Sequence, residues 1–257
     1  MYDFNIYFIG FAIMALTGLV TWLLSLKLHD VSIIDSVWSL LFLFASLVYV
    51  TMGDNTTPLG MLTLGLVGLW SIRLCLYLTY RNWNEPEDRR YLEMRDRHGD
   101  RFPMRSLYSV FGLQSVLAWV ISMPLFGIFQ SSSQIGPLAW AGALVVLFGI
   151  VFESIADLQL NRFVSDQSNN NRVLDSGLWR YSRHPNYFGE FCVWWGFYLI
   201  GLQANGWWTI ISRLLMSLLL LRVSGVTLLE KDISSRRPGY KEYVERTSAF
   251  FPLPTDN

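Results

Sequence analysis

Seven apolar segments, each about 20 residues long, restrict this 257-residue chain to folds that a lipid bilayer can hold. A helix satisfies its backbone polar groups internally, which is what the hydrocarbon core requires of a spanning segment. The predicted spans are residues 5–26, 33–52, 58–80, 108–130, 137–159, 186–204 and 207–229. We therefore expect an all-α integral membrane protein of about seven transmembrane helices.

The composition favours a membrane protein and argues against other classes. Hydrophobic residues make up 52% of the chain and charged residues only 16%. The formal net charge is zero, so the basic excess that binding to nucleic acid requires is missing. Both cysteines lie inside apolar segments, and the three histidines are dispersed, so neither a disulfide framework nor a metal site is expected.

Basic residues are distributed unevenly between the connections. Residues 81–107, residues 160–185 and the tail from Glu230 hold 16 of the 20 Lys and Arg residues. The connections on the other side of the predicted membrane hold none. Because loops rich in Lys and Arg stay in the cytoplasm, we expect the N terminus outside and the C terminus in the cytoplasm. The first apolar segment lacks a basic start and a convincing cleavage site and is expected to be retained.

Ionisable side chains inside the predicted spans need a partner or a task, because insertion of one at a helix centre costs at least ~2.5 kcal/mol. Glu153 and Asp157 are four residues apart, so they share one face of the fifth span. Arginines that hold helices together would satisfy them, and so would a ligand rich in hydroxyl, amide or ammonium donors. Asp35 begins the second span, where it is either a helix cap or a functional group.

The stretch LWRYSRHPNYFGE, residues 178–190, gathers polar groups at the start of the sixth predicted span. Arginines and a histidine occupy the connection that leads into that span, and arginine is suited to bidentate binding of phosphate. These residues are Arg162, Arg172, Arg180, Arg183 and His184. Arginines that only enforce topology or contact lipid headgroups do not explain the neighbouring Asn186, Tyr187 and Glu190. The stretch predicts a site for a phosphorylated cofactor without a GxGxxG or P-loop motif.

Two longer segments, SGLWRYSRHPNYFGEFCVWWG and LLEKDISSRRPGYKEYVERTSAFFP, resemble the C-terminal half of the steroid 5α-reductase superfamily. The segments LWSIRLCLYLTYRNWNEPEDRRY and FGLQSVLAWVISMP are similar to its bacterial branch. The resemblance implies an all-helical membrane protein with an NADPH site on the cytoplasmic side. It also implies one membrane domain, 1–257, in which residues 137–257 bind the cofactor and the helices of 1–130 lie on the substrate side.

The resemblance further implies which residues bind the cofactor. Asp157 matches a carboxylate that contacts it, arginines clamp its phosphates, and the Asn and Glu of NYFGE lie beside the nicotinamide. The set implied in this way is Asp157, Arg162, Arg172, Arg180, His184, Asn186, Tyr187, Glu190, and, in the tail, Glu230, Arg236 and Tyr240.

The chain departs from the steroid 5α-reductases in lacking the Gln-Glu pair that helps to polarise the substrate carbonyl. The candidate substitutes for this catalytic role are Asp35, Tyr77, Tyr80 and Gln114. The implied reaction is NADPH-dependent reduction of a conjugated carbon–carbon double bond in a steroid or other lipophilic enone that enters from the bilayer. Hydride goes to the β-carbon while a donor near the carbonyl stabilises the enolate.

Two other functions stay open. Isoprenylcysteine carboxyl and phospholipid methyltransferases are similar in carrying RHPxYxG and an acidic amphipathic C-terminal helix, and they bind S-adenosylmethionine. The Asn and Glu of NYFGE and the four nearby arginines favour NADPH over that cofactor. The remaining alternative is a lipid-binding membrane protein without enzymatic activity.

Overall fold

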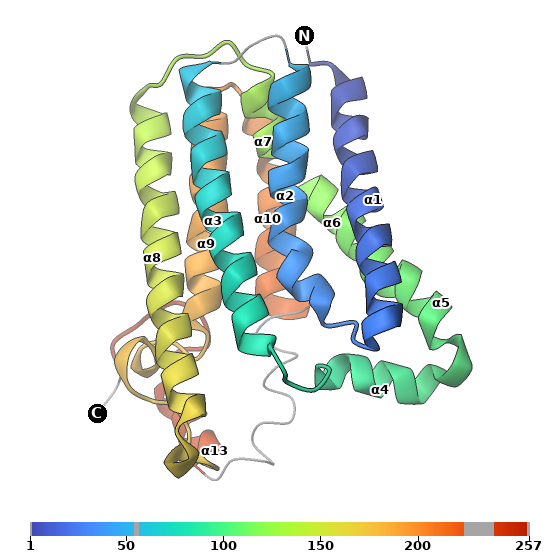
Figure 1. Ribbon diagram of the computed structural model, residues 1–257. Helices are drawn as coiled ribbons and strands as arrows, with labels where there is room; N and C mark the ends of the chain where they lie inside the picture. The colour runs from blue at the N-terminus through green and yellow to red at the C-terminus, as the bar shows by residue number, and fades with distance from the viewer. Residues whose placement is uncertain (1, 54–56, 224–238, 256–257) are drawn as a thin grey trace. The chain divides into compact units, whose positions relative to one another are not determined.

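The computed structural model describes residues 2–53, 57–223 and 239–255, and every regular element within these ranges is helical (Figure 1). Five helical segments are long and apolar enough to cross a membrane: Phe4–Leu28, Ile33–Met52, Pro58–Asn82, Arg89–Ile121 and Pro137–Ser165. The segment Arg89–Ile121 is a continuous run of shorter helices. The prediction of an all-α integral membrane protein is confirmed, with five candidate spans by these criteria where seven are predicted from the sequence.

The chain divides into two compact units. Unit 1 consists of residues 1–136 and 201–209, and unit 2 consists of residues 137–200 and 210–257.

Three long helices form the frame of unit 1 and run side by side in Figure 1: α1 (Phe4–Leu28), α2 (Ile33–Met52) and α3 (Pro58–Asn82). Asp3 caps α1 by accepting a hydrogen bond from the backbone N–H of Asn5 at 2.9 Å. Thr57 caps α3, whose first residue is a proline and so has no N–H that needs a partner. Their bounds agree closely with the first three predicted spans.

The fourth predicted span, 108–130, is wrong as one helix. α6 (Leu113–Ile121) ends before Ser122, and α7 (Met123–Phe129) begins after it. Pro124 lies at the start of α7, where it has no N–H to continue the hydrogen bonds of α6. The apolar composition is continuous through residues 108–130, but the helix is interrupted at Ser122.

The polar stretch 81–107 is also more ordered than a loop. It contains α4 (Arg89–His98) and α5 (Phe102–Ser106), followed by a π-helical turn, Leu107–Gly112. α4 runs roughly perpendicular to α1 and α2 in Figure 1. Its Tyr91 belongs to a buried apolar cluster with Ile34 and Phe111, so one face of α4 packs on other helices of unit 1.

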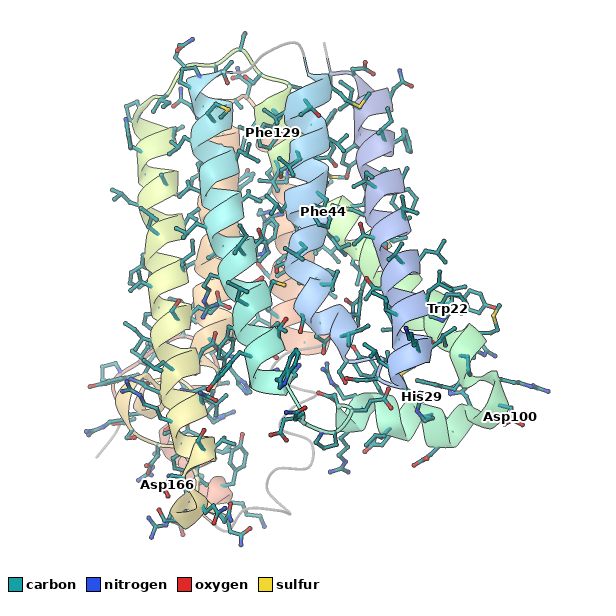
Figure 2. The ribbon with its side chains drawn as sticks, viewed as in Figure 1. Trp22, His29, Phe44, Asp100, Phe129 and Asp166 are labelled. Atoms are coloured by element: carbon teal, nitrogen blue, oxygen red, sulfur yellow. The ribbon has the colours of Figure 1, made fainter. Side chains whose placement is uncertain are left out.

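The start of α5 is hydrogen-bonded to α1. Trp22 lies on the part of α1 near α5 (Figure 2), and its indole N–H donates to the carbonyl of Pro103 at 2.9 Å. The segment from α4 to α5 therefore has a fixed place within unit 1.

Unit 2 contains α8 (Pro137–Ser165), α9 (Pro185–Gln203) up to Ile200, α10 (Ile210–Leu218) and the short α13 (Tyr240–Arg246). α9 matches the sixth predicted span, but the polar groups at its start keep it out of the five candidate spans. Of the seventh predicted span, α10 and a π-helical turn to Val223 are described, and residues 224–229 lie outside the described residues.

Glycines bring α8 and α9 into backbone contact. A Cβ atom on Gly149 of α8 would lie 2.6 Å from the carbonyl oxygen of Gly189 on α9. Further along, a Cβ atom on Gly196 would lie 2.7 Å from the carbonyl oxygen of Gly142. Side chains larger than hydrogen do not fit at these contacts, so α8 and α9 pack as closely as small-residue interfaces in membranes allow.

Gly149→Ala is expected to lower the thermal stability of the detergent-solubilised protein, because overpacking a tight contact costs about 1–3 kcal/mol. Gly65→Ala on α3 is the matched control, since no atom lies within 4 Å of the added Cβ. Thermal unfolding of both variants measures the difference. Equal melting temperatures would contradict the tight packing of α8 on α9.

Candidate functional site

The charged residues that are buried as whole residues gather in unit 2. In the described ranges, these Asp, Glu, His, Lys and Arg residues are Glu153, Asp157, His184, Glu190 and Arg213. In unit 1 the side chain of Glu87 is also only 5% exposed, but it forms an ion pair with the half-buried Arg95 at 2.9 Å. Burial of several charged groups in one helical unit is the pattern that most clearly marks a functional site in a membrane protein.

Two of these groups come from α8, one helical turn apart. Glu153 is 4% exposed and Asp157 is 3% exposed. The side-chain amide of Asn186, in the first turn of α9, donates to the Asp157 carboxylate at 3.4 Å. The close approach of α8 to Gly189 brings the backbone of α9 against Glu153. The structure thus joins the predicted site residues Asp157 and Asn186 and places Glu153 beside them.

The start of α9 supplies the other predicted groups of the motif. Glu190 is buried, and its carboxylate accepts a hydrogen bond from the indole N–H of Trp194 at 3.0 Å. His184 is buried, and its ring stacks on that of the half-buried Tyr187 with 5.7 Å between ring centroids. Pro185 begins the helix, a position where a proline disrupts no hydrogen bond.

The connection before α9 folds back against the end of α8. The indole N–H of Trp179 donates to the carbonyl of Ala156 at 3.0 Å, and the backbone N–H of Leu178 donates to the side chain of Gln159 at 2.9 Å. Gly177 has a φ of +61°, and a Cβ there would lie 2.5 Å from the Gln159 side chain, so only glycine fits this turn. This packing holds the motif next to the carboxylates of α8.

The predicted phosphate-binding arginines lie at the surface. Arg162, Arg172 and Arg180 all have exposed side chains, and Arg180 donates to the hydroxyl of Thr255 at 3.4 Å. Arg162 is on α8 and not in a loop as predicted, because α8 continues to Ser165, next to Asp166 (Figure 2). Exposed arginines are screened by solvent, in contrast to the buried carboxylates.

The C-terminal tail packs on the motif through Arg183, which the predicted cofactor-binding set omits. Its guanidinium donates to the carbonyls of Thr247 at 2.7 Å and Val244 at 3.1 Å, at the end of α13. The hydroxyl of Ser182 donates to the carbonyl of Phe250 at 2.8 Å. Carbonyls at a helix end have no partner within the helix, and this arginine satisfies them.

Of the three tail residues in the predicted site, one lies within the described residues and two do not. Tyr240 is buried in α13 and packs against the ring of Tyr243, whose hydroxyl donates to the carbonyl of Trp179. Glu230 and Arg236 lie outside the described residues.

The candidate catalytic residues all belong to unit 1. Asp35 accepts hydrogen bonds from Arg90 and from the Tyr91 hydroxyl, each at 2.9 Å, and the Gln114 side chain interacts with the same carboxylate. The sequence interpretation missed Arg90 and Tyr91, because they lie in a stretch predicted to be a loop. Asp35 is therefore part of an ion-paired network that joins α2 to α4.

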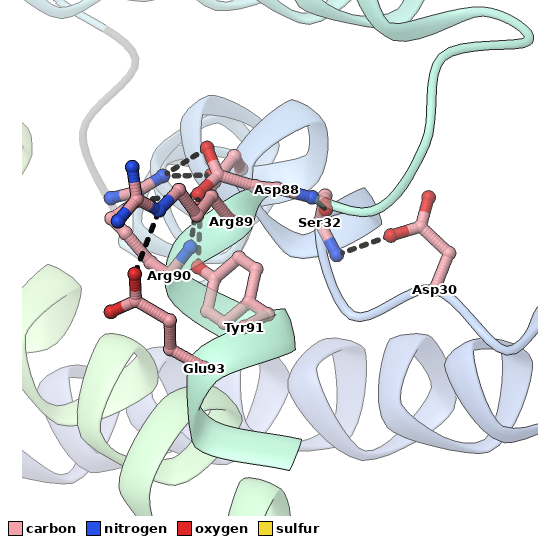
Figure 3. Close-up of polar contacts among 8 residues, drawn as sticks. Asp30, Ser32, Asp88, Arg89, Arg90, Tyr91 and Glu93 are labelled. Carbon is pink, nitrogen blue, oxygen red and sulfur yellow. Dashed lines mark hydrogen bonds and ion pairs between the residues drawn. The ribbon is translucent and has the colours of Figure 1, made fainter. Parts of the chain in front are cut away.

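The same network includes Asp88, which accepts from Arg90 at 2.9 Å (Figure 3). Burial opposes ionisation of Asp88, but the hydrogen bonds and positive charge of Arg90 outweigh it and hold the pKa of that carboxyl below its ordinary value. Tyr77 has the guanidinium groups of Arg73 and Arg81 at 5.5 and 5.7 Å from its ring centroid. Tyr80 is 72% exposed.

Arg183→Gln is expected to release the tail, because hydrogen bonds from a charged donor contribute about 1.5–3 kcal/mol. Chymotrypsin should then cleave near Tyr243 and Phe250 at least about tenfold faster, since cleavage follows the population of the opened segment. Arg162→Gln, at an exposed position on α8, is the control. Equal cleavage rates in the two variants would show that Arg183 does not hold the tail.

The chain is similar to an uncharacterised protein over nearly its whole length and to a methyltransferase over about half of it. An uncharacterised protein of Schizosaccharomyces pombe is 26% identical over 281 residues, which cover 98% of this chain and 81% of the relative. A protein-S-isoprenylcysteine O-methyltransferase of Dictyostelium discoideum is 29% identical over 135 residues, 49% of this chain and 53% of the relative. No solved structure matches significantly. The family of proteins of unknown function DUF1295 matches residues 21–247, and the chain belongs to it.

Proposed function

We propose that this protein is a membrane methyltransferase that uses S-adenosylmethionine to methylate an isoprenoid-carrying or other lipid acceptor. The observation that carries the proposal is the buried acidic group of unit 2, in which Glu153 and Asp157 of α8 meet the first turn of α9 at Asn186 and Gly189, and Glu190 is buried next to Gly189 in the chain. S-adenosylmethionine presents an ammonium, a sulfonium and ribose hydroxyls. These are the cations and donors that buried carboxylates bind best.

The sign of the buried charge favours this cofactor over a polyanion. Glu153 and Asp157 lie on one face of α8, so their negative charges repel in a region of low dielectric. A cationic ligand relieves that repulsion, whereas a nucleotide diphosphate adds to it.

The residues of the site would have different roles in binding the cofactor. Asp157 and Glu153 would accept hydrogen bonds from the ammonium or the ribose hydroxyls, and Asn186 would orient Asp157. Burial between α8 and α9 excludes water, which strengthens these contacts. When bound, S-adenosylmethionine supplies a methyl group to a nucleophilic atom of the acceptor.

The comparisons support the same proposal. The Dictyostelium relative is by its name an isoprenylcysteine O-methyltransferase, and about half of this chain aligns with it. The acceptor class that this suggests is lipophilic, which suits a protein whose helices are long and apolar enough to cross a bilayer. The quoted RHPNYFGE motif also agrees with the RHPxYxG pattern of such methyltransferases.

A second candidate is NADPH-dependent reduction of a lipid enone. The observation that favours it is the set of exposed arginines on α8 and on the connection before α9, Arg162, Arg172 and Arg180, which suit the phosphates of NADPH. The carbonyl-polarising role of Asp35, Tyr77, Tyr80 and Gln114 stays a prediction of this second candidate.

S-adenosylmethionine is expected to raise the melting temperature of the protein in mild detergent, because a ligand present at 100 times its Kd stabilises the folded state by about 2.7 kcal/mol. NADPH and NADH at matched concentrations serve as comparisons. Asp157→Asn should weaken S-adenosylmethionine binding at least about tenfold, since it removes a charged acceptor. The control is Asp166→Asn, the same substitution at an exposed position. Stabilisation by NADPH alone would reject the methyltransferase proposal.

If the second candidate is correct, Arg172→Gln is expected to weaken NADPH binding by about tenfold, because a phosphate contact contributes about 1.5–3 kcal/mol. S-adenosylmethionine should then not change the melting temperature of the protein. Titration of NADPH by its own fluorescence measures the affinity. The substitution Arg97→Gln in unit 1, at another exposed arginine, is the control. Unchanged NADPH affinity in Arg172→Gln would remove the arginines as an argument for reduction.

A further inference from the structure

We propose that Trp194 is a positioning residue for the Glu190 carboxylate and that the buried Arg213 holds Trp194 in place. This inference rests on the proposed function, because Glu190 is part of the cofactor site defined above. It assigns a task to the buried arginine of α10, which the sequence interpretation left aside.

The first link is between two buried residues one turn apart on α9. The indole N–H of Trp194 donates to Glu190 Oε1 at 3.0 Å. The indole nitrogen can only donate a hydrogen bond, so in this contact the carboxylate is always the acceptor. A hydrogen bond to a charged group in a buried region is among the stronger kinds. It also restricts a glutamate side chain that otherwise has high rotamer freedom.

The second link joins α9 to α10. Arg213 is fully buried, and its guanidinium carbon lies 4.7 Å from the centroid of the Trp194 ring. Its Nη1 donates to the Trp194 carbonyl at 3.2 Å, and its Nη2 donates to the Ser212 hydroxyl at 3.0 Å. Burying an arginine is costly unless it is well satisfied. Here the planar guanidinium contacts both the ring and the backbone of Trp194.

The neighbouring tryptophan provides a contrast on the same helix. The indole N–H of Trp195 donates to the hydroxyl of Ser217 at 3.3 Å. Trp195 therefore links α9 to α10 without contacting a carboxylate through this donor. Removal of its N–H tests the loss of an interhelical hydrogen bond alone.

The experiment is a double-mutant cycle on S-adenosylmethionine affinity, measured by thermal shift and equilibrium binding in detergent. Trp194→Phe keeps an aromatic ring but removes the donor. We expect it to weaken binding about as much as Glu190→Ala does, by about tenfold. The double variant should bind no more weakly than Glu190→Ala alone, since no carboxylate is then left for Trp194 to position. Trp195→Phe should leave the affinity unchanged.

A second cycle covers the case in which Trp194→Phe does not fold. Arg213→Lys keeps the charge but loses the planar stacking, so a loss of several-fold in affinity is expected. That loss should vanish in the Glu190→Ala background, where no carboxylate is left to position. Losses that multiply in both cycles, or an affinity that Trp194→Phe leaves unchanged, would overturn the positioning role even where the melting temperature falls.

The outcome for the proposed function is separate. If the unmodified protein binds NADPH and not S-adenosylmethionine, the methyltransferase proposal fails, and the same variants assayed with NADPH decide the role of Trp194. If it binds neither cofactor, both proposals fail.

Discussion

The backbone contact between α8 and α9 is the interaction on which the candidate site depends. Lipid tails are as apolar as the side chains of a helix, so close packing must replace the hydrophobic effect as the force that joins two helices in a membrane. Gly149 and Gly189 permit this packing because neither has a side chain to separate the helices. The same approach brings the amide of Asn186 within 3.4 Å of Asp157. Small residues thus position large polar ones.

Hydropathy was sufficient to predict helices that are apolar along their whole length, and it failed where polarity or a proline interrupts them. The first three spans are confirmed almost to the residue as α1, α2 and α3. Pro124 divides the fourth span, although it changes the local mean hydropathy little, because its effect is on hydrogen bonding. α4 was missed because its apolar face is narrow and is recognisable only when Tyr91 is seen to pack against unit 1.

Some residues of the candidate site could be predicted from the local sequence, and others could not. The resemblance to known families suggested Asp157, Asn186 and Glu190, and the structure shows all three at the start of α9 or against it. The contacts of Arg183 and Arg213 could not be predicted, since each depends on a partner far along the chain. The sequence shows which side chains are charged, but the fold determines which groups accept their hydrogen bonds.

The contrast between buried carboxylates and exposed arginines also decides how the two cofactor classes should be weighed. A charge pair at the surface contributes about 0–1 kcal/mol because water and salt screen it. The same pair in a low-dielectric interior interacts several times more strongly. We therefore propose that the buried Asp157 has more influence on which ligand binds than the exposed Arg172. The proposal of a cationic cofactor rests on the burial of these carboxylates and not on the number of arginines around them.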